Sequence, residues 1–368
     1  MGAWPAIHLL AQVAVLLLTF RALGSRATLS FRQLLLCGAF GASVGTVVLT
    51  IVQYQVFDHI DPPSAFWAWA PAQDLVVVGF VALLAASSRR RWRMSVVDFA
   101  LAGAAVAAGT ATVQLLMQTI VHDGPAAWYR PSFFFAIAGA LHVPALDFSF
   151  VGPYVYGVVI GLAFGIGARL RPATNLWIVT GVVGGLIAIA DHAESLSRLG
   201  DAYVTLGSPD TATSIGVTPP GFSDVVRTLM LHGRLLFFVA FGGLLLANVA
   251  EGLVVGRRLP DTRALMLPDE PTRPVSVIEW FTGWSALRRG VSAMRSTFAY
   301  FRARRSLLLC VTLHAPADEA SDLAARALVA RSDVEGPDAA RARGGNIMDW
   351  LRGAWPVVVA LAAVVVGL

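Results

Sequence analysis

Long apolar runs separated by short polar segments make up most of the chain. Such runs, each of about 17 residues or more, lie at 4–20, 34–56, 67–88, 95–121, 142–168, 175–192 and 229–255. A helix of roughly 20 apolar residues crosses the hydrocarbon core of a bilayer. The pattern therefore predicts an all-α, polytopic transmembrane helix bundle of seven spans, with a shorter final run at 355–368 as a marginal eighth.

Composition narrows the class of protein. Of the 368 residues, 56% are apolar and 14% are charged, whereas soluble domains carry about 25% charged residues. Every fixed positive side chain is an arginine, and the net charge of +5 lies mostly between the apolar runs. Arginines in such loops report membrane topology, so we expect no nucleic-acid partner. Only two cysteines occur, Cys37 and Cys310, which excludes a disulfide framework and a cysteine-based metal site.

The arginines predict how the bundle is oriented. Loops rich in arginine face the cytosol, and they lie at 21–32, 89–93, 169–171 and 257–258. The intervening loops carry acids and histidines, so we expect them outside, together with the N-terminus. A separate span at 133–141 would reverse this order, and we therefore interpret that segment as interfacial or re-entrant. The sequence thus predicts a multi-pass protein of the plasma membrane with residues 256–354 in the cytoplasm.

The chain divides into three regions. Residues 1–258 form the predicted bundle, with an external loop at 193–228 that is rich in Gly, Ser, Thr and Pro. Residues 259–354 are predicted to hold a proline-rich linker, a basic amphipathic helix and a partly disordered segment in which 317–331 is helical; 355–368 is the marginal membrane segment. The apolar stripe of the basic helix consists of Val277, Phe281, Trp284, Leu287, Val291, Met294, Phe298 and Phe301. Such a helix suits the anionic inner leaflet or the groove of a partner protein, which makes membrane lipids an expected partner.

Four of the predicted spans carry polar side chains near their outer ends. These are Gln73 and Asp74, Gln114, His142 and His192. A carboxylate within a span costs roughly 2.5–3.5 kcal/mol on insertion scales, so its presence requires a reason. From the helical rise, Asp74 and Gln114 lie roughly 10 Å below the outer surface, in one layer with the histidines. Carboxylate and imidazole groups at one depth are what a water-activating or metal-binding site requires, although the pattern does not fix their lateral distances.

The order of these motifs resembles the PrsW family of intramembrane proteases, within the CAAX-protease and bacteriocin-processing superfamily. The resemblance covers about residues 30–260, and the arginine-rich helix beyond it is similar to the tail of actinobacterial members. In chain order, the matching positions are Pro71-Ala72-Gln73-Asp74, the arginines at 89–93 with Asp98, the small-residue helix 103–114, His142 and His192.

The resemblance implies a peptidase that activates water against a peptide bond of a single-span membrane protein near the outer leaflet. Asp74 would be the base, and His142 and His192 would be its partners or, with Asp74, the ligands of a divalent metal such as Zn. Gln73 and Gln114 stand where the family has acids, and amides cannot take up a proton; Glu194 is a replacement acid. The alternative is a catalytically inactive relative that acts as a membrane scaffold or sensor through its external loop and cytosolic helix.

Three other features have structural explanations. Asp98 follows Ser95 by three residues, which predicts capping at the start of a helix. The ladder of Gly157, Gly161 and Gly165 is typical of close helix packing. Glu251 is expected to form an interfacial ion pair with the arginines at 257–258.

Overall fold

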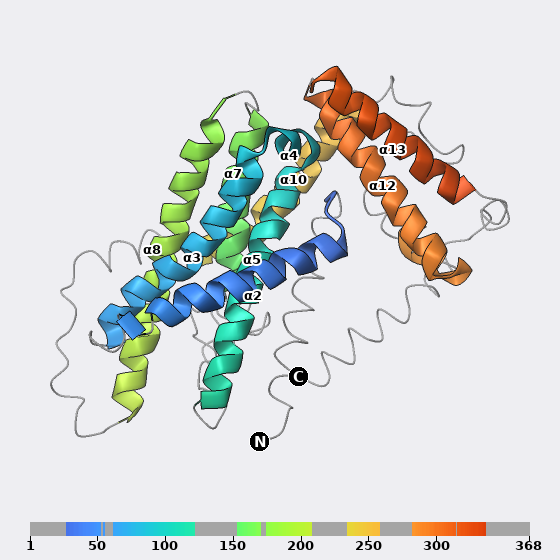
Figure 1. Cartoon of the computed structure of the whole chain (residues 1–368). Coiled ribbons are helices and arrows are strands. Elements are labelled where there is room, and N and C mark those ends of the chain that lie inside the picture. The colour runs from blue at the N-terminus through green and yellow to red at the C-terminus, as the bar shows by residue number, and fades with distance from the viewer. Residues whose placement is uncertain are drawn as a thin grey trace.

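The computed structural model describes residues 27–52, 54–55, 62–121, 153–170, 174–207, 234–257, 282–313 and 315–335. Within these residues the regular structure is entirely helical. The predictions for 4–20, 133–141, the linker and 355–368 fall outside the described residues. Figure 1 shows the helices α2 (Phe31–Val52), α3 (Pro62–Ala86), α4 (Ser88–Arg93), α5 (Val96–Val121), α7 (Pro153–Leu170), α8 (Leu176–Gly207), α10 (Arg234–Arg257), η5 (Ala286–Arg289), α12 (Val291–Thr312) and α13 (Ala317–Glu335).

The helices of the first 258 residues follow the apolar runs closely. Helices α2, α3, α5 and α10 each occupy one predicted run, and α7 covers the second half of the run 142–168. Helix α8 corrects the predicted loop 193–228, because it continues through that loop's first part to Gly207. The run ends at 192 because hydropathy falls there, but the cluster of helix-breaking residues begins only after Gly207.

Helix α5 is the centre of the bundle. It packs against α2, α3, α7 and α10, while α8 packs against α3 and α7 on the outside of that group. Alanine and glycine make up most of the buried stretch of α5, so neighbouring backbones can approach it from several sides. This arrangement brings α3, α7 and α8 together, and these three helices carry the site described below.

The predicted glycine ladder lies at the contact between α5 and α7. A Cβ atom added to Gly157 would collide with the carbonyl oxygen of Gly103, and one added to Gly161 would collide with that of Phe99. In both cases the obstacle is backbone, which cannot rotate away as a side chain can. The glycines therefore set how closely the two helices approach, which confirms the packing role predicted for them.

We expect Gly161→Ala to lower the free energy of unfolding by about 1–3 kcal/mol, because α7 must move away from α5. Gly79→Ala is the matched control, since a Cβ there meets nothing within 4 Å and alanine favours the helix. Thermal unfolding of both variants in detergent makes the comparison. An equal loss at the two positions would show that close approach of α5 and α7 does not limit stability.

Two of the described helical segments, Arg32–Val52 and Leu176–Ala193, are long and apolar enough to cross a membrane. Shorter apolar segments lie at Ala70–Ala86, Val96–Thr112, Tyr154–Leu170 and Phe238–Val254. Large apolar side chains also point outward from the bundle, among them Leu36, Leu83, Val179, Leu186 and Leu246, which are 60–69% exposed.

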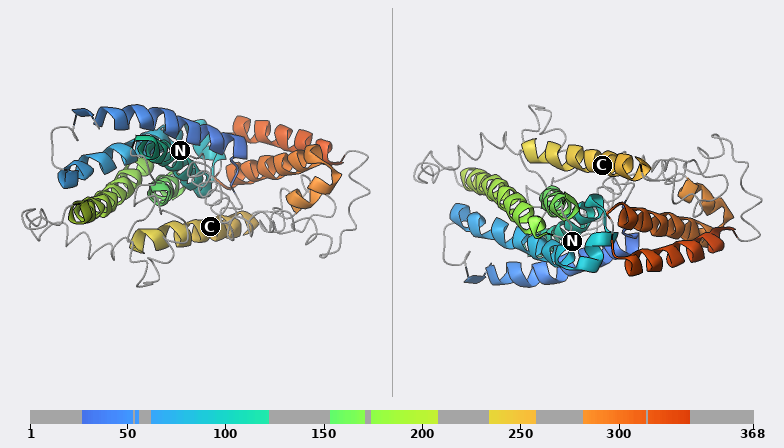
Figure 2. Two further views of the ribbon diagram at one scale, coloured as in Figure 1. Left: turned by 90° about the horizontal axis from the view of Figure 1, so that it is seen from below. Right: turned by 90° about the horizontal axis from the view of Figure 1, so that it is seen from above.

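Helices α12 and α13 form a C-terminal hairpin at one end of the bundle, as the two views of Figure 2 agree. The helix predicted at 317–331 is confirmed and runs from Ala317 to Glu335. The prediction of a single amphipathic helix from 277 onward is wrong. It breaks at Gly290, whose φ of 111° few other residues adopt, and η5 folds back so that Trp284 meets Phe298.

Candidate functional site

A buried carboxylate–imidazole pair joins α3 to α8. The Oδ2 atom of Asp74 lies 2.9 Å from Nδ1 of His192, and the two side chains are 0% and 1% exposed. The structure thus brings together two of the predicted site residues, which are separated by more than a hundred positions in the chain. Pro71 lies inside α3 one turn before Asp74, so the helix interior near the pair already lacks one backbone donor.

Two residues that sequence analysis did not select complete this cluster. The ring of Tyr156 on α7 stacks on the imidazole of His192, with centroids 4.4 Å apart and an interplanar angle of 21°. Its hydroxyl donates to Oδ2 of Asp191 at 3.1 Å. Asp191 could have been found by the rule that selected Asp74, because it is a carboxylate within an apolar run. Nothing in the sequence signals Tyr156, since its role depends on how α7 packs against α8.

Two polar atoms in this region have no hydrogen-bond partner in the described part of the chain. They are Nε2 of Gln73, a donor, and Oδ1 of Asp74, an acceptor, and both residues are at most 1% exposed. Buried polar groups in native proteins are almost always satisfied. These two atoms can therefore bond a polar group of a ligand, such as the carbonyl and amide of a peptide unit.

The remaining predicted site residues are not placed at this pair. Gln114 lies on α5 and Glu194 on α8, but the described part of the structure does not include their side chains. His142 lies outside the described residues. Whether these three join the cluster stays a prediction.

The described residues do not test the predicted metal site, because His142, one of its three expected ligands, lies outside them. They contain no group of three or more His, Cys, Asp or Glu side chains that could hold a metal ion. His192 uses Nδ1 to meet Asp74, so this carboxylate occupies the position of a group that orients a histidine rather than a ligand beside it. At this pair the carboxylate and the imidazole therefore act on each other, and a metal site stays a prediction.

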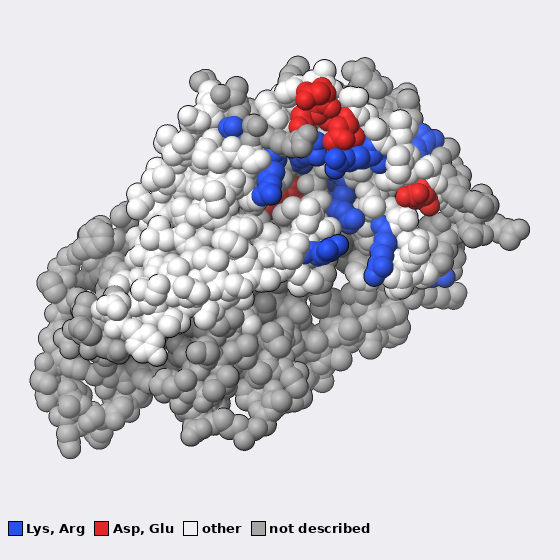
Figure 3. Space-filling model, viewed as in Figure 1, with Lys and Arg blue, Asp and Glu red and all other residues white. Residues whose placement is uncertain are grey.

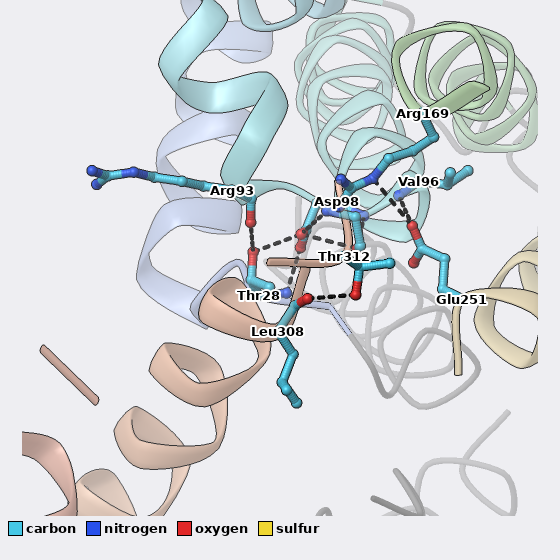
Figure 4. Close-up of polar contacts among 9 residues, drawn as sticks. Thr28, Arg93, Val96, Asp98, Arg169, Glu251, Leu308 and Thr312 are labelled. Atoms are coloured by element: carbon cyan, nitrogen blue, oxygen red, sulfur yellow. Dashed lines mark hydrogen bonds and ion pairs between the residues drawn. The ribbon is translucent and has the colours of Figure 1, made fainter. Parts of the chain in front are cut away.

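A second polar cluster, at the start of α5, has a structural role (Figure 4). Ser95 and Asp98 form a reciprocal capping box, because Asp98 N donates to Ser95 Oγ at 2.9 Å and Ser95 N donates to Asp98 Oδ2 at 2.7 Å. The capping predicted for Asp98 is therefore confirmed. The same carboxylate also accepts from the backbone N–H groups of Thr28 and Leu29, at 2.6 and 2.8 Å, and from the Thr28 hydroxyl at 2.6 Å.

Glu251 extends this cluster to α7 and α10. Its Oε1 atom accepts from Val96 N at 2.7 Å, another free donor of the first turn of α5, and lies 3.5 Å from Nε of Arg169. Arg169 of α7 is thus one ion-pair partner of Glu251. The described part of the structure does not include the side chains of the arginines at 257–258, so the pairing predicted with them stays a prediction. Helix ends leave such donors unpaired, and Glu251 meets that need while linking three helices.

The C-terminal hairpin is attached through α4, the short helix that the arginine-rich segment 89–93 forms. Arg93 donates to Glu319 from Nε at 2.8 Å and from Nη2 at 2.5 Å, and to Asp322 at 2.8 Å. Beside it, Trp92 packs against the apolar contact between α12 and α13, in which Leu307 and Cys310 are buried. One short helix therefore holds the hairpin by both charge and apolar contact.

No protein-family model, no curated protein and no solved structure matches this chain.

Proposed function

We propose that this chain is a PrsW-like, membrane-embedded peptidase that cleaves a single-span membrane protein near the outer leaflet. The observation that carries the proposal is the buried contact between Asp74 and His192, which provides an oriented base inside the bundle. The ordered motifs of the PrsW resemblance supply the reaction class.

The outward-facing apolar side chains support a multi-pass bundle of seven or eight spans in the plasma membrane. A soluble monomer rarely exposes large contiguous apolar patches, whereas α2, α7, α8 and α10 all carry strongly exposed Leu, Ile, Val or Phe. Arg93 and Arg169 lie at the same end of α5, since both reach groups around its first turn. That end would face the cytoplasm by the arginine rule, with the N-terminus outside and 256–354 inside.

The pair then has a direct role in hydrolysis. With its Nδ1–H donated to Asp74, His192 is held in the tautomer whose Nε2 carries a lone pair. This nitrogen accepts a proton from water as the water oxygen bonds to the carbonyl carbon, and later returns it to the leaving amine. Tyr156, held by Asp191, keeps the imidazole plane fixed, and Nε2 of Gln73 is a donor suited to the developing oxyanion.

A second candidate, an inactive relative that acts as a scaffold or sensor, is favoured by Thr110. In the resemblance, Thr110 and Gln114 begin and end a motif whose last residue is an acid in the family, and Gln114 stands in place of that acid. The hydroxyl of Thr110 donates to the carbonyls of Gly41 and Val106, at 3.0 and 3.1 Å, and these contacts serve helix packing. In this candidate the C-terminal hairpin carries out the scaffold or sensor function.

Comparing membrane-protein N-termini in cells that express the wild type, Asp74→Asn or His192→Ala separates the two candidates. We expect N-termini that appear with the wild type and are lost, by at least about a hundredfold, with both variants. Asp333→Asn, which removes an exposed acid of α13, is the matched control and should process normally. Equal N-termini in these four cell lines would count against the peptidase. If cells then lose the protein's function only with Arg93→Glu, which repels Glu319 and Asp322, the scaffold would be established instead.

A further inference from the structure

Charge is divided unequally between the two helices of the C-terminal hairpin. Helix α12 carries four arginines and no acid, whereas α13 begins with Asp318 and Glu319 and has Asp322 in its next turn. Glu319 and Asp322 bind Arg93 of α4, and Asp322 also pairs with Arg326 of its own helix. These two acids are therefore engaged away from α12.

Three of the α12 arginines, Arg295, Arg302 and Arg305, share one side of the helix, which we term the basic face. Arg302 follows Arg295 by two turns and precedes Arg305 by one, while Arg304 lies on the opposite side and is buried. Within the described part of the chain, Arg295 and Arg302 form no ion pair. Burial, and then the positive charge of Arg305, lower the pKa of Arg302. Two like charges are thus held together where an anion would stabilise both.

The basic face adjoins the start of α2. Arg305 donates from Nη1 to the carbonyl of Ala27 at 3.3 Å, just before the helix that begins at Phe31. About one turn into α2, Leu35 and Leu36 are 54% and 60% exposed. A cationic surface therefore lies near an exposed apolar one, the order in which a phospholipid presents its phosphate and its acyl chains.

The position of the hairpin agrees with a cationic surface next to an apolar one. In Figure 3 the charged side chains gather over the hairpin and its junction with the bundle, and the rest of the described surface on that face is almost uncharged. The apolar residues Tyr300, Phe301, Leu307 and Leu308 of α12 are already buried within the protein. The helix consequently does not insert into a bilayer by its apolar side, and its basic face is the side that can meet an anionic ligand.

We propose that the basic face of Arg295, Arg302 and Arg305 binds the phosphate of an anionic phospholipid of the cytoplasmic leaflet, whose acyl chains lie along Leu35 and Leu36. Guanidinium groups bind phosphate oxygens in paired hydrogen bonds, and a basic segment beside a membrane gains affinity for anionic lipid with each arginine. The inference rests on the membrane-embedded bundle proposed above, but not on peptidase activity.

Native mass spectrometry of the full-length protein in detergent tests the site with three probes: phosphatidylglycerol, phosphatidylcholine and inorganic phosphate. We expect phosphatidylglycerol to bind the wild type at least tenfold more tightly than phosphatidylcholine. Removal of each arginine charge should weaken that binding about fivefold, hence about 25-fold for Arg302→Gln with Arg305→Gln. Arg326→Gln with Arg331→Gln, which removes the same charge from α13, should bind as the wild type does.

The double variant Arg302→Lys with Arg305→Lys keeps both positive charges. It should therefore retain most of the preference for phosphatidylglycerol over phosphatidylcholine. Equal binding of the two lipids, equal losses in the α12 and α13 double variants, or full competition by inorganic phosphate would each overturn the proposal. The measurement is repeated on Asp74→Asn protein, which should keep the lipid preference whether or not the wild type cleaves peptides. Release of the protein from membranes by alkaline carbonate would instead refute the bundle on which both proposals depend.

Discussion

Asp98→Ala should unfold far more readily than the wild type, with a loss of about 3–5 kcal/mol in the free energy of unfolding. The Asp98 carboxylate is fully buried and accepts from five donors, two of them on Ser95, two on Thr28 and one on Leu29. Alanine leaves three backbone N–H groups without their acceptor, and each such buried donor costs about 1–3 kcal/mol. Denaturant titration of the protein in detergent measures the difference.

Asp98→Asn should cause a smaller loss in the free energy of unfolding than Asp98→Ala. The amide keeps one oxygen for the N–H groups of Thr28 and Leu29, but its NH₂ group faces Ser95 N, which then has no acceptor. We expect about half the loss seen with alanine. Asp333→Ala, at an exposed acid near the end of α13, is the control and should change stability by less than about 0.5 kcal/mol. If Asp98→Ala behaves like Asp333→Ala, the five hydrogen bonds contribute no net stability.

The local half of this cluster could be predicted from the sequence, and the distant half could not. The spacing of Ser95 and Asp98 is a local signal, because a capping box involves only the first turn of one helix. The bonds from Thr28 and Leu29 to the same carboxylate depend on α2 packing against α5, for which the sequence holds no register. Glu251 illustrates the same limit: its contact with Arg169 joins α10 to α7, and no local pattern in the sequence signals it.

Some of the helices could likewise be predicted from the sequence, whereas the break between two of them could not. Long apolar runs predicted α2, α3, α5 and α10 because hydrophobic length alone specifies them. The break at Gly290 was missed because the apolar stripe continues across it in the sequence, and only a backbone with positive φ separates the two segments. At the candidate site, depth along the helices suggested Asp74 and His192, whereas Tyr156 depends on the contact between α7 and α8.

Removing either member of the Asp74–His192 pair alone should cost about 3–5 kcal/mol, because the remaining polar group would be buried without its partner. We expect this loss for Asp74→Leu and for His192→Phe, which keeps an aromatic ring against Tyr156. The double variant should be no less stable than either single variant, since replacing a buried polar pair with apolar side chains is often neutral. The coupling free energy between the two positions would then be about 3 kcal/mol or more.

Unfolding of the four proteins in one detergent completes this double-mutant cycle, with Tyr156→Phe as the control. That change keeps the ring stack but removes the bond to Asp191, so it should cost only about 1 kcal/mol. Additive losses from Asp74→Leu and His192→Phe would mean that the 2.9 Å contact carries no coupling. A stable double variant would also distinguish loss of the fold from loss of catalysis. Because the bundle remains folded in it, any loss of substrate cleavage would be due to the missing Asp74–His192 pair.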